Sequence, residues 1–186
     1  MDRDSIRRAV GGYRRVELPR TETCASVFLP VVTGESGAEV LFTKRPESLN
    51  SHGGEVSFPG GVVDEGESTL DGAHREVYEE IGVPASRIEV VGTLDDEISK
   101  AGFRVTPYVG LLSEPLNLVL SPDEVSAVYR IPLETLADPE LRWTENWVRR
   151  GEKVTVYFFR HNHDIIWGLT ARILYKFLVT LKMLDN

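Results

Sequence analysis

Three glutamates within five residues, Glu76, Glu79 and Glu80, have the spacing in this sequence that most clearly suggests chemistry. In a helix, residues three or four apart lie on one face, so Glu76 lies beside both of the others. Like charges at these spacings cost about 0.2–0.5 kcal/mol per pair, and carboxylates near a helix C-terminus also oppose the helix dipole. A bound divalent cation would compensate for this repulsion, because Mg²⁺ and Mn²⁺ prefer oxygen ligands. The alternative is a solvated surface whose charge Arg75 and water neutralise.

The residues that precede this helix favour the cation. Residues 52–61 read HGGEVSFPGG and form a glycine-rich loop directly ahead of it. Gly60 and Gly61 lack a Cβ atom, so their backbone can approach a ligand closely, and both are expected to contribute to a substrate site. A glycine-rich loop followed by clustered carboxylates predicts a site for a metal ion and a phosphate group.

Residues 61–83 resemble the Nudix box, the signature of hydrolases that act on a nucleoside diphosphate linked to another group. The pattern is a glycine, a glutamate after five residues, and then, after seven more, Arg-Glu-aliphatic-x-Glu-Glu-x-Gly-aliphatic. All nine constrained positions match over 23 residues: Gly61, Glu67, Arg75, Glu76, Val77, Glu79, Glu80, Gly82 and Val83. This match is far more specific than a lone glycine motif.

The resemblance implies a role for each polar residue of the box. Glu76, Glu79 and Glu80 would bind Mg²⁺ or Mn²⁺, with help from the backbone carbonyl of Gly60. Arg75 would orient the glutamates by hydrogen bonds, and Glu67 would hold the loop or support the ligands from outside. The alternative for Arg75 is an exposed ion-pair partner of Glu79.

Hydrolysis of a pyrophosphate also needs a group that accepts a proton from the attacking water. Glu124 lies in the run SPDEVSAVYRIPLETL, between a loop with a proline and a predicted strand. The resemblance makes Glu124 a candidate base or an additional metal ligand, and it forms the predicted catalytic set with Glu79 and Arg75. The alternative for Glu124 is an ordinary residue at the start of a strand.

Residues 41–61 bear on the substrate, because they resemble the signature of the coenzyme A pyrophosphatase branch of the Nudix family. The matching residues are Leu41, Thr43, Arg45, Gly54, Phe58, Pro59, Gly60 and Gly61, and the later run IIWGLTARIL is also typical of this branch. Arg45 is the predicted phosphate contact, with a surface arginine as the alternative. His52 either lines the pocket or is structural. Three positions depart from the signature: Phe42, Pro46 and Asn50. Asn50 stands where the signature has a cationic residue that could contact a phosphate. This departure bears on the identity of the substrate and leaves the expected reaction unchanged.

Composition narrows the class of protein. The chain has 186 residues, 41% apolar and 27% charged, as expected for a single globular domain spanning residues 1–186. The net charge of −8 argues against nucleic acid as the partner, whereas a bound cation would still admit a small nucleotide such as coenzyme A. No apolar run approaches the ~20 residues of a membrane span, so we expect a cytoplasmic protein without a membrane partner. Cys24 is the only cysteine and is expected to be buried in a strand. The sequence is compatible with both a monomer and a homodimer.

Hydrophobic patterns predict a mixed sheet with helices against it. Strands are expected at residues 26–32, 39–44, 88–94, 105–112, 125–131 and 154–160, with a brief strand-like segment at 55–58. Short helices are expected at residues 2–10 and 132–137, and longer ones at 68–81 and about 170–184. Ser68 is the predicted start of the helix before Gly82. The acidic run Asp95–Asp96–Glu97 is expected to be a solvated turn.

These observations predict an α/β (α+β) Nudix fold, with a mixed β-sheet sandwiched between α-helices. The expected activity is metal-dependent hydrolysis of coenzyme A-type nucleoside diphosphate derivatives to adenosine 3′,5′-bisphosphate and 4′-phosphopantetheine. Two alternatives remain open. One is a Nudix hydrolase of ADP-ribose, dinucleotides or other nucleoside diphosphate derivatives. The other is a non-catalytic, nucleotide-sensing Nudix module, which would be expected to have lost carboxylates of the box.

Overall fold

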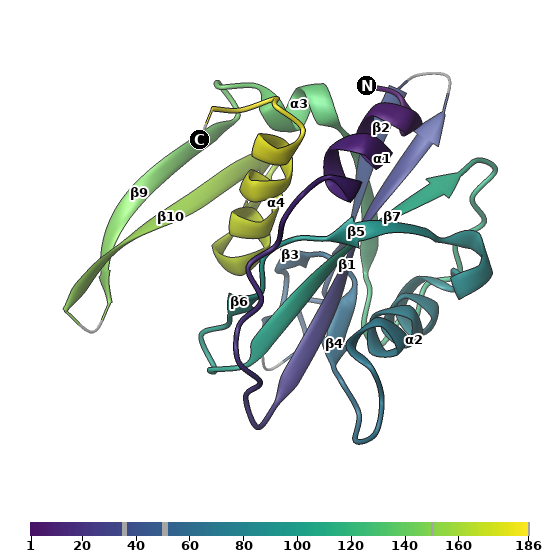
Figure 1. Cartoon of the computed structure of the whole chain (residues 1–186), viewed down its shortest axis with the longest axis horizontal. Helices are drawn as coiled ribbons and strands as arrows, with labels where there is room; N and C mark the ends of the chain where they lie inside the picture. The colour runs from purple at the N-terminus through teal and green to yellow at the C-terminus, as the bar shows by residue number, and fades with distance from the viewer. Residues whose placement is uncertain (35–36, 50–51, 150, 186) are drawn as a thin grey trace.

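A larger mixed sheet lies between helices in the computed structural model, which describes residues 1–34, 37–49, 52–149 and 151–185 (Figure 1). The four α-helices of the described part are α1 (Arg3–Gly11), α2 (Thr69–Ile81), α3 (Leu133–Ala137) and α4 (Gly168–Thr180). The larger sheet contains β1 (Cys24–Gly34), β2 (Gly37–Lys44), β3 (Val56–Ser57), β4 (Gly60–Val62), β5 (Glu89–Thr93), β6 (Glu97–Ile98), β7 (Arg104–Ser113) and β8 (Ala127–Pro132). A smaller sheet contains β9 (Arg142–Arg149), β10 (Glu152–His161) and β11 (Asp164–Trp167). A short 3-10 turn, Ala85–Arg87, follows α2.

The larger sheet combines parallel and antiparallel pairs, which confirms the predicted mixed sheet. The strand order is β3-β2-β1-β7-β5, and β4, β6 and β8 pair with β1, β7 and β2. β1 is parallel to β7 and antiparallel to both β2 and β4. Because single residues of β1 such as Ala25 pair with both β4 and β7, these two strands lie on opposite edges of β1.

Alternate side chains of β1 point to the two faces of the sheet, as expected for a strand. Phe28 and Val32 pack with the apolar face of α2, whereas Leu29 and Val31 pack with α1 and α4. Full burial of such a side chain is worth about 1.5–3 kcal/mol. The sheet is thus covered on both faces, and α4 also contacts the smaller sheet, whose strands β9 and β10 extend from the body as a long hairpin (Figure 1).

The helix that carries the glutamates forms where the sequence predicts it. The hydroxyl of Ser68 accepts a hydrogen bond from the Asp71 amide at 3.1 Å, and Gly82 ends the helix in the left-handed conformation with φ 71°. Ala73, Val77 and Ile81 are buried against the sheet and form the apolar face of α2. The remaining faces of α2 are free to present its carboxylates.

Other elements differ from the prediction. The glycine-rich loop contains a strand, β4, which pairs with β1. β6, β9 and β11 are not predicted, because β6 and β11 are short and most side chains of β9 are partly or fully exposed. α4 spans Gly168–Thr180 and so begins and ends earlier than the predicted helix. Cys24 is 8% exposed at the start of β1, which confirms a buried strand thiol.

The predicted solvated turn at Asp95–Asp96–Glu97 is wrong, since Asp96 and Glu97 are only 4% and 6% exposed. Asp96 accepts hydrogen bonds from the Leu18 amide at 3.0 Å and the Thr106 hydroxyl at 2.9 Å. Ion-pair partners from α4 neutralise the other two carboxylates. Lys176 lies 2.9 Å from both Asp95 and Glu97, and Arg172 lies 2.7 Å from Glu97.

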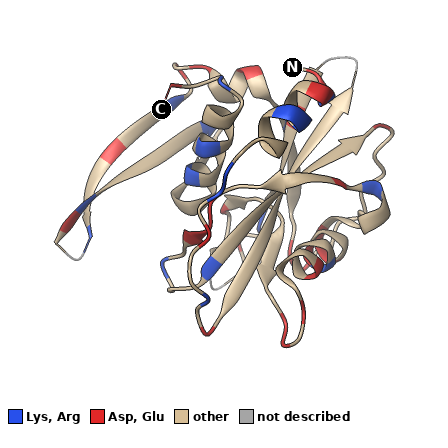
Figure 2. Ribbon diagram, viewed as in Figure 1, with Lys and Arg blue, Asp and Glu red and all other residues tan. Residues whose placement is uncertain are grey.

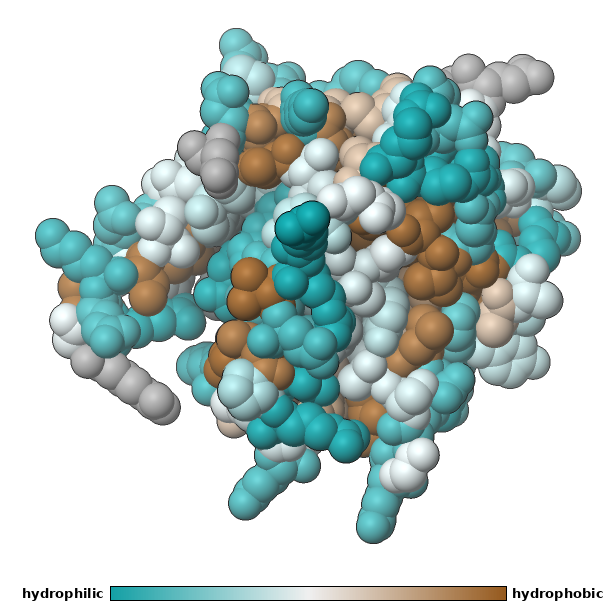
Figure 3. Space-filling model, in the orientation of Figure 1, coloured by the Kyte–Doolittle hydropathy of each residue, from teal (hydrophilic) through white to brown (hydrophobic). Residues whose placement is uncertain are grey.

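Charged side chains are distributed unevenly over the molecule. Acidic residues mark α2 and the loops beside it, whereas basic residues recur along α4 (Figure 2). In the space-filling view, the extended segment after α1 forms a hydrophilic band between apolar patches (Figure 3). None of the described helices is both long and apolar enough to cross a bilayer.

Candidate active site

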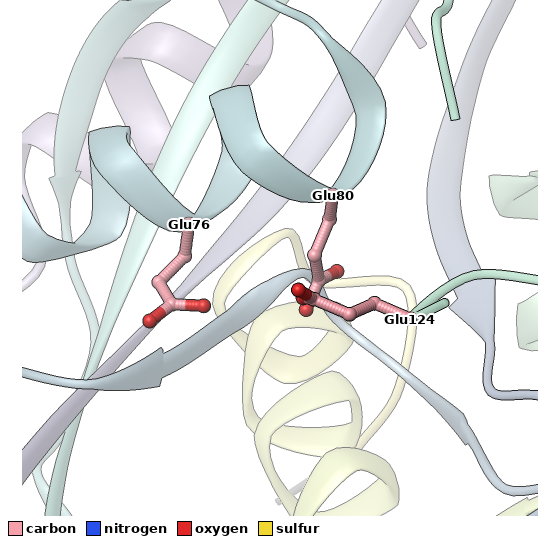
Figure 4. A group of neighbouring side chains, drawn as sticks. All are labelled: Glu76, Glu80 and Glu124. Atoms are coloured by element: carbon pink, nitrogen blue, oxygen red, sulfur yellow. The ribbon is translucent and has the colours of Figure 1, made fainter. Parts of the chain in front are cut away.

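Three carboxylates from two separate segments converge beside α2. Glu76, Glu80 and Glu124 each offer an oxygen, and these oxygens all lie within 4.8 Å of one another. Glu76 and Glu80 project from the same side of α2, and Glu124 reaches across from a neighbouring loop toward Glu80 (Figure 4). The structure therefore brings together two of the predicted metal ligands and the candidate base.

The loop that carries Glu124 is attached to the C-terminal end of α2. The backbone amides of Val119 and Ser121 donate hydrogen bonds to the carbonyls of Ile81 and Glu80, both at 3.0 Å. These carbonyls belong to the last turn of α2, where a helix leaves acceptors without intrahelical partners. The amide of Glu124 in turn donates to the Ser121 carbonyl at 3.1 Å. Capping of α2 thus places Glu124 next to Glu80.

Gly60 and Gly61 leave no room for a side chain. A Cβ atom at Gly60, whose φ is +152°, would lie 2.3 Å from the carbonyl oxygen of Ser26 in β1. A Cβ atom at Gly61 would lie 2.4 Å from a carboxylate oxygen of Glu76. The glycine pair therefore lets β4 pair with β1 and lets Glu76 lie directly against the strand. The predicted substrate-binding role of both glycines, and that of the Gly60 carbonyl toward a metal, stay predictions.

Arg75 connects the glutamates of the box to the loop before α2. Its Nη1 donates to Glu76 at 2.8 Å and to Glu79 at 3.0 Å, and its Nε and Nη2 both donate to Glu67 at 3.2 Å. Nη2 also donates to the Val62 carbonyl at 2.9 Å. These contacts raise the pKa of Arg75 and lower the pKa of Glu67. The geometry is what an orienting residue requires, and it also makes Arg75 the ion-pair partner of Glu79.

Glu79 lies outside the convergent group. Its side chain is 50% exposed and binds Arg75. Adjacent residues of a helix point about 100° apart, so Glu79 and Glu80 cannot share one direction. The predicted roles of Glu79 as metal ligand and catalytic residue stay predictions, whereas Glu124 occupies the third place in the cluster.

The environment of Glu80 opposes its ionisation. Burial, together with the negative charges of Glu76 and Glu124, raises the pKa of Glu80 to about 7. The Gly60 amide and the Thr43 hydroxyl, 3.3 Å away, act in the opposite direction because they donate hydrogen bonds to the carboxylate. Burial also raises the pKa of Glu76, against the lowering effect of Arg75. Thr43 is not a predicted site residue, although it belongs to the signature at residues 41–61.

The cluster has the chemistry of a divalent-cation site. Its donors are all carboxylate oxygens, which suit Mg²⁺ and Mn²⁺. Among the described residues, Arg75 is the cation that contacts the cluster, through Glu76. A cation bound among Glu76, Glu80 and Glu124 would relieve both their repulsion and the cost of ionising a buried carboxylate. The residues present therefore fit the predicted metal.

The residues before the Nudix box that are predicted to contact substrate do not belong to the carboxylate cluster. Arg45 follows β2 and is half-buried, and its Nε has no hydrogen-bond partner in the described part of the chain. His52 is mostly exposed, and its Nδ1 lies 2.8 Å from Glu55. Asn50 lies outside the described residues. The phosphate-binding role of Arg45 stays a prediction.

Comparisons with known proteins show one family. The NUDIX domain family model matches residues 23–163. An uncharacterized Nudix hydrolase NudL from Photorhabdus laumondii subsp. laumondii is 37% identical over 153 residues, which are 82% of this chain and 81% of the relative. A protein of the same name from Salmonella newport is 38% identical over 151 residues, covering 81% and 78% of the two chains.

Solved structures share the fold. The Nudix hydrolase RenU from M. smegmatis aligns with TM-score 0.53 and 25% identity over 62% of this chain and 73% of that one. A C. elegans Ap4A hydrolase in a binary complex aligns with TM-score 0.51 and 24% identity, covering 59% and 80% of the two chains. Because the family model matches residues 23–163, which are most of the chain, the chain belongs to the Nudix family.

Proposed function

We propose that this Nudix hydrolase cleaves the pyrophosphate of coenzyme A-type nucleoside diphosphate derivatives in a reaction that depends on Mg²⁺ or Mn²⁺. The products would be adenosine 3′,5′-bisphosphate and 4′-phosphopantetheine. The single observation that carries the reaction class is the convergence of Glu76, Glu80 and Glu124 beside the glycine strand β4. The substrate rests on the resemblance of residues 41–61 to the coenzyme A pyrophosphatase signature. The single buried cysteine fits a reducing compartment, and the proposed location is the cytoplasm.

The reaction forms a bond between a water oxygen and one phosphorus and breaks the bond from that phosphorus to the bridging oxygen, which leaves with the other phosphate. When bound, Mg²⁺ or Mn²⁺ supplies positive charge for the phosphoryl oxygens and lowers the pKa of water. Glu76 and Glu80 would hold the metal from one side of α2, and Arg75 would keep the Glu76 carboxylate in place by its hydrogen bond. Thr43 and the Gly60 amide fix the direction of Glu80.

The proton of the attacking water needs an acceptor outside the buried pair. Glu124 is the first candidate because its carboxylate adjoins Glu80 and its side chain is exposed to solvent. In an alternative assignment, Glu124 is a third metal ligand and the half-exposed Glu79 accepts the proton. The two assignments differ in which carboxylate accepts the proton, so they do not change the proposed reaction.

The second candidate function is hydrolysis of ADP-ribose, a dinucleotide or another nucleoside diphosphate derivative. It is favoured by Asn50, which stands where the coenzyme A signature has a cation. The loss of that cation would weaken a contact to the 3′-phosphate of coenzyme A, which ADP-ribose lacks. Retention of every carboxylate of the box argues against a non-catalytic sensor.

A substrate panel tests the proposal. The purified protein is incubated with Mg²⁺ or Mn²⁺ and coenzyme A, 3′-dephospho-coenzyme A, ADP-ribose or NADH, and the products are separated by chromatography. We expect coenzyme A to be cleaved with the highest kcat/KM. A preference for ADP-ribose would overturn the substrate and leave the reaction intact. Absence of turnover with every pyrophosphate would overturn the enzymatic function.

A further inference from the structure

A second candidate site lies across α2 from the carboxylate cluster. An open hollow of about 550 Å³ is lined by Glu17, Leu18, Pro19, Arg20, Thr69 and Arg104. Arg104 is the first residue of β7, and the hydroxyl of Thr69 lies 2.7 Å from that of Tyr108 in β7. The carboxylates instead lie beside β4 and β2, through Gly61 and Thr43. Because β4 and β7 occupy opposite edges of β1, the hollow and the cluster lie on opposite flanks of α2.

Arg104 is the main reason to regard the hollow as a binding site. The residue is 7% exposed, yet its guanidinium group is only partly satisfied. Nη1 donates to the Leu18 carbonyl at 3.0 Å and lies 3.9 Å from Asp96, whereas Nε has no partner in the described part of the chain. An anion in the hollow would supply acceptors to the part of this guanidinium group that lines it.

The lining of the hollow contains two positive groups, Arg20 and Arg104, and one negative group, Glu17, whereas the whole chain has a net charge of −8. Arg15 and Arg104 share Asp96, at 3.7 and 3.9 Å, and Arg15 also binds Glu17 at 2.9 Å. Arg20 lines the hollow without an ion-pair partner among the described residues. Within the lining, two guanidinium groups therefore face the carboxylate of Glu17.

The start of α2 adds to this field. Thr69 is the first residue of a 13-residue helix, and the first amides of a helix have no acceptors within it. The Ser68 hydroxyl caps the amide of Asp71 and also donates to the Asp71 carboxylate, so it does not cap the amide of Thr69. Helix starts with free amides and nearby arginines suit phosphate groups.

We propose that this hollow binds a small phosphorylated anion, with its phosphoryl group between Arg20, Arg104 and Thr69. The volume lies within the range of about 300–1,000 Å³ that is typical of small-molecule sites, so an organic part has room beside the phosphate. The site does not depend on the proposed hydrolase activity, because it shares no residue with the carboxylate cluster.

The test is a titration of inorganic phosphate into the full chain in the presence of EDTA, which keeps the carboxylate cluster free of metal. Binding is followed by calorimetry and by the ¹⁵N–¹H signals of Thr69 and Leu70. We expect saturable binding that weakens with added salt, signal changes at both amides, and weaker binding of acetate. Binding that leaves these amides unchanged, or equal affinity for acetate, would overturn the assignment.

Two variants and a matched control sharpen the test without disturbing the buried Arg104. Arg20→Ala should weaken phosphate binding at least ~5-fold, because it removes a charge-assisted contact. Glu17→Gln should strengthen binding, because it removes the negative charge at the rim. Arg14→Ala removes an exposed arginine that does not line the hollow and should leave the affinity unchanged. Equal affinities of the Arg20 and Arg14 variants would contradict the proposal.

Discussion

Glu80, a proposed metal ligand, lies where ionisation of its carboxylate costs stability. Its carboxylate is buried beside two others, and its pKa of about 7 means that ionisation of the metal-free protein is unfavourable. The sequence marks Glu80 through the Nudix box, but it does not show the depth of burial or the neighbouring Glu124. Glu80 is buried because β2 and β4 lie against it. Glu124 lies in a loop whose position depends on tertiary contacts.

The metal-free protein should therefore lose stability as pH rises from about 4.5 to 7. In this window the unfolded chain has ionised Glu80 while the folded protein keeps it protonated, so folding binds a proton that higher pH removes. Glu80→Gln should remove this contribution and stabilise the metal-free protein at pH 8 by at most about 3 kcal/mol. Urea unfolding in EDTA at pH 5 to 8 measures the free energy of unfolding of the wild type and of the variant. Parallel pH profiles would contradict the shifted pKa.

Arg75 should be irreplaceable by lysine. A lysine keeps the charge but cannot donate in several fixed directions to Glu67, Glu76 and Glu79 at once. Arg75→Lys should lower kcat or metal affinity about 10- to 100-fold while the protein remains folded. Arg87→Lys is the control, because Arg87 donates to the backbone carbonyls of Ser113 and Pro115, which do not belong to the cluster. If both variants retain full activity, Arg75 does not orient the glutamates.

At the scale of elements, β4 and α2 form the site together. The sequence predicts α2 well, because Ser68 and Gly82 are local signals for its two ends. β4 is read as a loop, because Gly60–Gly61–Val62 has little strand propensity and forms a strand only by pairing with β1. The glycines expected to approach a ligand are thus also required by the pairing and by Glu76.

Gly61→Ala should separate activity from stability. The added Cβ would lie 2.4 Å from the Glu76 carboxylate, which is the flexible end of a side chain and can move away. We expect turnover to fall at least ~10-fold with a small change in melting temperature, because the displaced group is a proposed metal ligand. Gly34→Ala is the matched control, since its Cβ would make an ordinary contact at 3.7 Å with Glu114. Full activity of the Gly61 variant would show that the position of Glu76 is not critical.

The acidic run before β7 is the clearest failure of prediction at this scale. Its partners Lys176 and Arg172 lie about 80 residues away in α4, so no local pattern reveals that the carboxylates are buried and paired. The ion pairs join the middle of α4 to Asp95 and to Glu97 of β6.

Lys176→Met should destabilise the fold without affecting the chemistry. It would leave Asp95 and Glu97 with less compensation in a mostly buried position, which we expect to cost about 1–3 kcal/mol. Chemical denaturation measures the loss, and kcat at a temperature where both proteins are folded should be unchanged. An unchanged free energy of unfolding would mean that the ion pairs contribute nothing net.

At the scale of the whole molecule, the two faces of the larger sheet are covered by different helices. α1 and α4 bury the main apolar cluster on one face, and α2 presents the carboxylates on the other. The sandwich was predictable, because the helices and most strands carry clear apolar patterns. Of the smaller sheet, the strand predicted at residues 154–160 is β10, whereas β9 was not predicted, since it exposes most of its side chains and is held by pairing with β10.

The central claim is that Glu76, Glu80 and Glu124 form a divalent-cation site, and Mn²⁺ binding tests it most directly. Free Mn²⁺ is measured by electron paramagnetic resonance as the folded protein is titrated at pH 8, with the wild type and Glu80→Gln compared. The account predicts saturable binding to the wild type and at least ~10-fold weaker binding to the variant. Equal Mn²⁺ affinity of the two proteins would contradict it.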